Sequence, residues 1–352
     1  MIQASVVIPC YNNAALIGCC LDSLERQTLR DALEIIVVDD GSRDNSPQIV
    51  GSYPVRLIRQ QNGGPAAARN AGAAAARAPV VLFLDGDCVA PPRWAESMIG
   101  ALQDGKAEAA VGTIVASTMG VLPALIQMEI EQRYARLRRR DYVDFIAAPS
   151  CAVRRDCFLR IGGFNEAFRF NEDVELAFRL NAAGHGIRFV QDVPVSHAHQ
   201  VRWWDYMRAK FWRGVWRMRL YRLYPKKSVR DDWTPQTLKL QILAACLTPL
   251  AMLAGLFDPI FWAAAGALLT MTVALGWPVI DLAMTGLRPR SPWTAGFWAT
   301  VFLLVRSFTL AASLVYDRAT TARTPALMRP IVSATQRHPI ADAQESTGQR
   351  VA

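Results

Sequence analysis

The sequence lacks the cysteine pattern of a disulfide framework or of a zinc site. Seven cysteines are present among 352 residues, but no two form a CxxC pair, and several lie inside apolar runs. We therefore expect them to be buried and reduced. The opening stretch, MIQASVVIPCYNN, also lacks the charged start of a signal peptide and runs straight into a strand-like segment. This predicts that the first two-thirds of the chain stays in the cytoplasm.

Charged residues are scarce over 238–316, whereas residues 1–235 alternate short apolar runs with polar turns. The net charge is +9, and many of the basic residues lie just before the apolar region. These residues are Arg202, Arg208, Lys210, Arg213, Arg217, Arg219, Arg222, Lys226 and Lys227. A positive-inside bias belongs at this position. No recognition motif for nucleic acid accompanies the charge, so we expect a membrane surface and not a nucleic acid as the partner.

Three apolar segments make up a predicted membrane region, residues 236–316. Residues 240–257 and 259–280 are each about long enough to cross the hydrocarbon core, and the tight turn between them predicts a hairpin. The third segment, 294–316, has Arg306 at its centre. Two interpretations of it stay open: a further span, or an interfacial or re-entrant helix.

Two stretches of different character flank this region. Residues 200–235 mix tryptophan, tyrosine and arginine, which is typical of an interfacial helix. Residues 317–352 show no periodicity and are expected to form a flexible tail.

Short apolar strands alternate with helical patterns over residues 1–199, the predicted catalytic domain. The strands are expected in ASVVIPCY, LEIIVVDDGS, VRLIRQ and VVLFLDGD, and helices lie between them. This alternation predicts an α/β fold with a mostly parallel sheet covered by helices on both faces. Such sheets bind ligands at the carboxyl ends of their strands. The polar residues at those ends are Tyr11, Asn12, Asp39, Asp40, Asp85 and Asp87.

Asp85 and Asp87 are separated only by Gly86, directly after a buried strand. Two carboxylates this close repel each other, and a divalent cation removes that penalty. Hard oxygen ligands suit Mg²⁺ or Mn²⁺. The alternative is a solvated turn, because Asp-Gly is also a common turn dipeptide. The two residues alone leave both interpretations open.

The stretches VVIPCYNN, EIIVVDDGSRDNS, GGPAAARNAG, VLFLDGDC and GGFNEAFRFNEDVELAFRL, in this order and spacing, resemble family 2 inverting glycosyltransferases of GT-A fold, of the membrane-associated bacterial type. The resemblance covers roughly residues 4–225. It implies a nucleotide-diphosphate sugar donor, a Mg²⁺ or Mn²⁺ cofactor, and inversion by a single displacement. It also implies donor contacts from Pro9, Tyr11, Asn12, Asp39, Asp40, Arg69, Asp85, Asp87 and Arg213. For Arg213, anchoring at the membrane surface is the alternative.

The same resemblance implies roles for two further motifs. Asp85 and Asp87 match the DXD that holds the metal, and His197 or His199 completes the metal site in some relatives; a structural histidine is the alternative. Glu172 and Asp173 match the family's ED pair, in which Asp173 is the general base that takes the acceptor proton. The alternative for this pair is favourable charge at a helix N-terminus. For Arg69 the alternative is an exposed surface charge.

The QxxRW motif of polymerising members is degenerate here, since QVRWW is one residue too short. With three apolar segments, this favours transfer of a single sugar. The hairpin predicts a membrane-bound acceptor, a lipid-linked saccharide or glycolipid, for cell-envelope or exopolysaccharide assembly at the inner (cytoplasmic) membrane, with the catalytic domain facing the cytoplasm. Two alternatives remain: a polyprenyl-phosphate glycosyltransferase, and a catalytically inactive, membrane-tethered binding or scaffold protein on the same fold.

Overall fold

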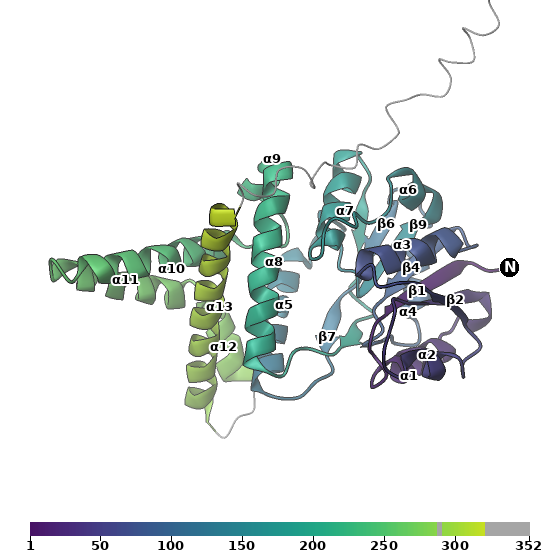
Figure 1. Ribbon diagram of the computed structural model, residues 1–352, viewed down its shortest axis with the longest axis horizontal. Helices are drawn as coiled ribbons and strands as arrows, with labels where there is room; N and C mark the ends of the chain where they lie inside the picture. Colours follow the sequence, from purple (N-terminus) through teal and green to yellow (C-terminus); the bar gives the residue numbers. More distant parts are fainter. Residues whose placement is uncertain (287–290, 321–352) are drawn as a thin grey trace, which may run out of the picture.

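The computed structural model describes residues 1–286 and 291–320 (Figure 1). Its centre is a sheet of eight strands in the order β3-β2-β1-β4-β9-β6-β10-β8. The strands are β1 (Ala4–Cys10), β2 (Leu33–Asp39), β3 (Arg56–Arg59), β4 (Val80–Leu84), β6 (Ala109–Val111), β8 (Tyr142–Val143), β9 (Ser150–Arg154) and β10 (Ile187–Phe189). Strands β1 to β4 pair in parallel, whereas β8 and β9 run antiparallel to their neighbours. The predicted mostly parallel α/β sheet is confirmed.

Helices cover both faces of this sheet (Figure 1). They are α1 (Ile17–Glu25), the 3-10 helix η1 (Arg30–Ala32), α2 (Ser46–Val50), α3 (Pro65–Ala75), α4 (Trp94–Gly100), α6 (Arg155–Arg160) and α7 (Glu172–Ala182). The apolar runs of β1, β2 and β4 are buried because neither face of a covered parallel sheet meets water. Phe83 on β4 packs against Phe158 of α6 and against Phe164, with ring centroids 5.3 and 5.1 Å apart.

A second, small sheet lies beside the end of β4. It has the order β5-β11-β7 and is made of β5 (Cys88–Val89), β7 (Ile114–Ala116) and β11 (Val195–His197). In its register His197 pairs with Cys88 on one side and with Ala116 on the other. The sheet therefore holds His197 next to the residue that follows Asp87.

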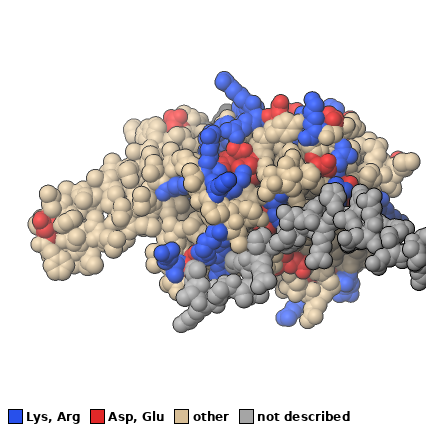
Figure 2. All heavy atoms as spheres, turned by 90° about the horizontal axis from the view of Figure 1, so that it is seen from above, with Lys and Arg blue, Asp and Glu red and all other residues tan. Residues whose placement is uncertain are grey.

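The remaining helices form the other end of the molecule: α5 (Val121–Leu137), α8 (Trp203–Leu223), α9 (Pro225–Val229), α10 (Gln236–Ala254), α11 (Ile260–Ala274), α12 (Trp277–Gly286) and α13 (Pro292–Thr320). Helices α8 and α13 lie side by side, and α10 with α11 projects away from the sheet (Figure 1). Figure 2 shows the projecting end almost free of charged side chains. Within the described ranges, α10 and α13 are the helices long and apolar enough to cross a membrane.

The second predicted segment, 259–280, is not one continuous helix. Helix α11 ends at Ala274, and the chain bends by 53° before α12. Pro278 has no N–H to continue the helical hydrogen bonds. A Cβ on Gly276 would lie 2.4 Å from Leu303 Cδ1, so this glycine lets α13 approach the bend. The predicted hairpin therefore has a broken second arm, which reaches spanning length only if both pieces count as one span.

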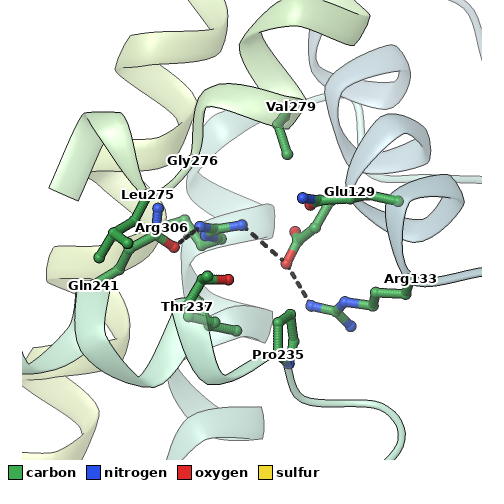
Figure 3. A pocket seen from close by; sticks show the side chains of 11 residues that line it. Glu129, Arg133, Pro235, Thr237, Gln241, Leu275, Gly276, Val279 and Arg306 are labelled. Atoms are coloured by element: carbon green, nitrogen blue, oxygen red, sulfur yellow. Dashed lines mark hydrogen bonds and ion pairs between the residues drawn. The ribbon is translucent and has the colours of Figure 1, made fainter. Parts of the chain in front are cut away.

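Arg306, at the centre of the third apolar segment, is buried inside the protein. Its guanidinium donates to Gln241 Oε1 on α10 at 2.6 Å and lies 3.3 Å from a carboxylate oxygen of Glu129 on α5 (Figure 3). Arg133 and Lys210 also contact this carboxylate. These polar contacts join α13 to α5 and α10, and they satisfy a charge that lipid would not. Residues 317–320 of the predicted tail continue α13, and the rest of that tail lies outside the described residues.

Candidate active site

The carboxyl ends of β1, β2 and β4 meet at one edge of the sheet, because these three strands are parallel neighbours. The loop after β4 packs tightly on the end of β1. A Cβ on Gly86 would lie 2.8 Å from Asn13 Nδ2 and 3.3 Å from the Pro9 carbonyl oxygen. Glycine is therefore the residue that allows Asp85 and Asp87 to follow β4 at this close approach.

The two aspartates at the end of β2 are buried and hydrogen-bonded. Asp40 accepts from the backbone N–H groups of Gly63 and Gly64, both at 2.8 Å, so it holds the turn that starts α3. Asp39 accepts from the N–H of Ser42 at 3.1 Å and pairs with an arginine of β3. Each carboxylate thus has a structural partner in addition to its predicted donor contact.

The end of β1 is more open. Tyr11 is 49% exposed. Asn12 takes a left-handed conformation with φ of 48°, and its side-chain oxygen accepts from the N–H of Arg43 at 2.8 Å. The exposed Tyr11 ring is available to a ligand at this edge, where the sequence predicts the nucleotide.

Arg69 joins the two acidic motifs. It is buried on α3, and its guanidinium donates to Asp85 Oδ1 at 2.6 Å and to Glu172 Oε1 at 2.8 Å. Burial opposes the charge on Arg69, but Asp85 and Glu172 outweigh it and raise the pKa of the guanidinium. The interpretation of Arg69 as an exposed surface charge is wrong. One arginine brings the end of β4 and the start of α7 into a single site.

The other aspartate of the pair, Asp87, faces a histidine. Asp87, Cys88 and His197 place one ligand atom each within 4.8 Å of one another. Asp87 Oδ2 lies 3.6 Å from His197 Nε2. Burial raises the pKa of Asp87, and the nearby His197 opposes this shift. Burial also raises the pKa of the Cys88 thiol, which disfavours the thiolate that a metal would need. Asp87 and His197 remain, and they offer the oxygen and nitrogen ligands that suit Mn²⁺.

A chain of hydrogen bonds behind His197 fixes which of its nitrogens carries the proton. Gln127 donates its amide to the carbonyl of Ile114 and to the carboxylate of Glu131, both at 3.2 Å. Its Oε1 must then accept from His199 Nε2, 3.1 Å away.

The rest of the chain follows from the tautomer of a neutral ring. With its proton on Nε2, His199 accepts at Nδ1 from His197 Nδ1, 3.0 Å away. Burial is the main cause that lowers the pKa of His199 to about 4, which keeps this ring neutral near pH 7. A neutral His197 that donates from Nδ1 carries its lone pair on Nε2, the nitrogen that lies 3.6 Å from Asp87 Oδ2.

Comparison with known proteins identifies the family of the sheet domain. Residues 5–162 match Glycosyl transferase family 2. This part of the chain belongs to the family. A pre-mycofactocin glycosyltransferase of Mycobacterium tuberculosis is 30% identical over 264 residues, which make up 72% of this chain and 55% of the relative. A validoxylamine A glucosyltransferase of Streptomyces hygroscopicus is 34% identical over 223 residues, 52% of each chain. The chain thus spans about half the length of these curated relatives.

A solved structure supports the fold of this family 2 protein. The mannosyltransferase PcManGT from Pyrobaculum calidifontis, in complex with GDP-Man and Mn²⁺, has a TM-score of 0.53 at 20% identity. The match covers 91% of this chain and 87% of that one. The GT-A fold predicted from the sequence is confirmed.

The ED pair lies beyond the matched residues, and its two carboxylates have different contacts. Glu172 is buried against Arg69, and burial raises its pKa while Arg69 opposes the shift. Asp173 is half-buried. Its two oxygens accept from the N–H of Val174 at 2.8 Å and from that of Ala148 at 3.2 Å. Of the two carboxylates, Asp173 is the one with access to a ligand.

The predicted site is partly assembled in the structure. Asp87 and His197 lie together, whereas Asp85 contacts Arg69, and His199 uses both ring nitrogens within the protein. Arg213 is exposed on α8, and its carbonyl accepts from Asn171, just before the ED pair. Gln127 was not foreseen from the sequence, since a glutamine on a helix carries no motif; only its contact with His199 reveals it.

Proposed function

We propose that this protein transfers one sugar from a nucleotide-diphosphate donor to an acceptor hydroxyl, with inversion at the anomeric carbon. The observation that carries the proposal is the bridge of Arg69 between Asp85 and Glu172, beside the Asp87–His197 pair. It gathers a cation-binding carboxylate, a fixed positive charge and the ED pair at one sheet edge. Relatives named as glycosyltransferases and a neighbour that holds GDP-Man and Mn²⁺ support it.

For the donor, we assign Asp87 and His197 as the residues that hold the metal, with Asp85 beside them. When bound, Mg²⁺ or Mn²⁺ neutralises the negative charge that develops on the diphosphate leaving group. The hydrogen bonds from Gln127 through His199 present the unprotonated Nε2 of His197 for this purpose. Arg69 offsets the charge of Asp85, so the paired carboxylates are tolerated before the donor arrives.

The exposure of Asp173 assigns it as the base, and the donor contacts follow the prediction from the sequence. Asp173 takes the proton of the acceptor hydroxyl as its oxygen attacks the anomeric carbon. Glu172 is a positioning residue that orients Arg69. The nucleotide lies at the strand ends, against the residues predicted from the sequence: Pro9, Tyr11, Asn12, Asp39 and Asp40. The exposed Arg213 on α8 contacts the diphosphate.

The apolar helices attach the enzyme to the inner membrane, with its family 2 domain in the cytoplasm. Helices α10 and α13 have the length and hydropathy of spans, and the projecting end carries few charges (Figure 2). Attachment raises the effective concentration of the enzyme near a membrane-bound acceptor. The acceptor is then a lipid-linked saccharide or glycolipid of cell-envelope or exopolysaccharide assembly.

A nucleotide-release screen tests the proposal. Purified protein is offered UDP-, GDP- and dTDP-sugars with Mn²⁺ or Mg²⁺, and with a lipid-diphosphate-linked saccharide, a neutral glycolipid, polyprenyl phosphate or a free saccharide as acceptor. We expect turnover with one of the two membrane-bound saccharides. Asp173→Asn should lower it by about 10²–10⁴-fold, while the exposed Asp156→Asn on α6 should not.

Each of the other outcomes would change or refute a part of the proposed function. Turnover with polyprenyl phosphate alone would replace the proposal by the carrier-loading alternative. Turnover with free saccharides alone would refute the membrane-bound acceptor. No turnover with any donor would favour the inactive binding or scaffold protein, and full activity of Asp173→Asn would remove the assigned base.

A further inference from the structure

A cavity of about 760 Å³ lies between the family 2 domain and the apolar helices. One wall comes from β7 and the start of α5, and it includes Ala116, Ala124 and Gln127. The opposite wall comes from α12 and α13, and it includes Leu282 and Trp298. This volume suits a small-molecule ligand.

The cavity adjoins the candidate metal site through shared residues. Gln127 lines it and is also the acceptor for His199 Nε2. Thr118 lines it, and its hydroxyl exchanges hydrogen bonds with the backbone of His199, both at 3.1 Å. Ala116 pairs with His197 in the small sheet. One strand and one side chain therefore separate the cavity from the histidine that faces Asp87.

The lining has two chemical characters. Toward α12 and α13 it is apolar, and Trp298 is 41% exposed there. Toward α5 it offers the amide of Gln127 and the carboxylate of Glu131. Among the described residues that line the cavity, Glu131 is the one ionisable side chain, and no lysine or arginine is present. A phosphate placed here would meet a like charge without a cation to offset it.

We propose that this cavity binds the acceptor, and that the acceptor is an uncharged amphiphile; this inference rests on the proposed function. The lipid-proximal part of its head lies at Gln127 and Glu131, beside the candidate metal site, and the reacting hydroxyl lies on the part of the head that extends from there to Asp173. Its apolar chain lies along α12 and α13, which continue toward the membrane-associated end. The chemistry is that of a neutral glycolipid and not of a lipid diphosphate.

Photolabelling tests the site without any donor. The full chain in detergent micelles is irradiated with a dodecyl glucoside that carries a diazirine in its chain, and labelled peptides are identified by mass spectrometry. We expect labels at the lining residues, such as Met119, Leu282 and Trp298. Unlabelled dodecyl glucoside should abolish these labels at a concentration at least tenfold lower than the one needed with dodecyl phosphate.

Two variants fill the cavity, and one control does not. Ala124→Trp and Val121→Trp place an indole in the lining, and each should cut labelling at least tenfold. Ala135 lies on an exposed part of the same helix, so Ala135→Trp should leave the labelling unchanged. Glu131→Gln should let dodecyl phosphate compete. Thermal midpoints identify variants that fail to fold, and using two lining positions keeps the test decisive.

The outcomes separate this inference from the proposed function. Labels confined to α10 and α11, labelling unchanged in both cavity variants, or equal competition by dodecyl phosphate would each overturn it. Correct labelling of a protein that never turns over a nucleotide sugar would instead leave the site standing as a binding site and sink the proposed function. Turnover of a membrane-bound saccharide by a protein whose labels lie outside the cavity would overturn this inference and leave the proposed function standing.

Discussion

Replacing Gln127 by methionine is the sharpest single change that the site allows. Methionine fills a similar volume but cannot accept the hydrogen bond from His199 Nε2. The amide contacts to Ile114 and Glu131 are lost as well. The change touches neither Asp87 nor His197, so any effect on metal binding must travel through the histidine pair.

The magnitude follows from the hydrogen bonds. A buried N–H left without a partner costs about 1–3 kcal/mol, and His199 is 5% exposed. His199 escapes this cost by moving its proton to Nδ1, but that nitrogen then faces the N–H of His197 Nδ1. His197 must in turn carry its proton on Nε2, where a metal ligand needs a lone pair. Loss of such a supporting contact lowers metal affinity by about 10–100-fold.

A Mn²⁺ titration followed by the electron paramagnetic resonance of the free ion measures this without any substrate. We expect Gln127→Met to weaken binding by about 10–100-fold, or about 1.4–2.7 kcal/mol. Gln127→Glu should restore part of the affinity, because its carboxylate still accepts from His199 but repels the Ile114 carbonyl and the Glu131 carboxylate. Gln103→Met, an exposed glutamine on another segment, is the control. Equal Mn²⁺ affinity of wild type and Gln127→Met would refute the tautomer argument.

Three further predictions concern stability, and thermal midpoints measure each. Arg69→Met leaves the buried Glu172 unpaired and should lower the free energy of unfolding by about 3–5 kcal/mol. If Glu172→Gln, added to this variant, recovered none of the loss, the prediction would be contradicted. Gly72→Ala puts a Cβ 2.3 Å from Val7 Cγ1 and should lower the free energy of unfolding by about 1–3 kcal/mol. If Val7→Ala, added to this variant, recovered no stability, the clash would be refuted. Burial lowers the pKa of Lys210 to about 8, so above that pH the unfolded chain binds the extra proton and rising pH favours folding. Relative to Lys210→Met, wild type should therefore gain stability from about pH 7.5 to about pH 9.5, and a loss would be inconsistent with that burial.

The strands and their acidic ends could be predicted because local rules decide them. Apolar runs bounded by turns fix β1, β2 and β4, and parallel neighbours bring their carboxyl ends together. The burial of Arg69 could not be predicted, since an arginine among alanines on α3 is compatible with either face. Only the packing of α7 against the sheet brings Glu172 to it.

The histidine pair and the apolar helices show the same limit. The strand period places His197 and His199 on one side, but their different roles depend on Gln127, which lies 72 residues from His199 in the chain. Similarly, the apolar run 259–280 has spanning length, yet Pro278 and the close approach at Gly276 break it. Long-range contacts, invisible to periodicity, decide both cases.

Metal-dependent release of nucleoside diphosphate from a sugar donor, by wild type and by Asp87→Asn, tests the central claim most directly. The substitution keeps the size of the side chain but removes the charge that faces His197. The account predicts turnover by wild type that needs Mn²⁺ or Mg²⁺ and is lost with chelator, and a fall of at least about 100-fold in Asp87→Asn. Undiminished turnover by Asp87→Asn, or turnover by wild type that ignores the chelator, would contradict it.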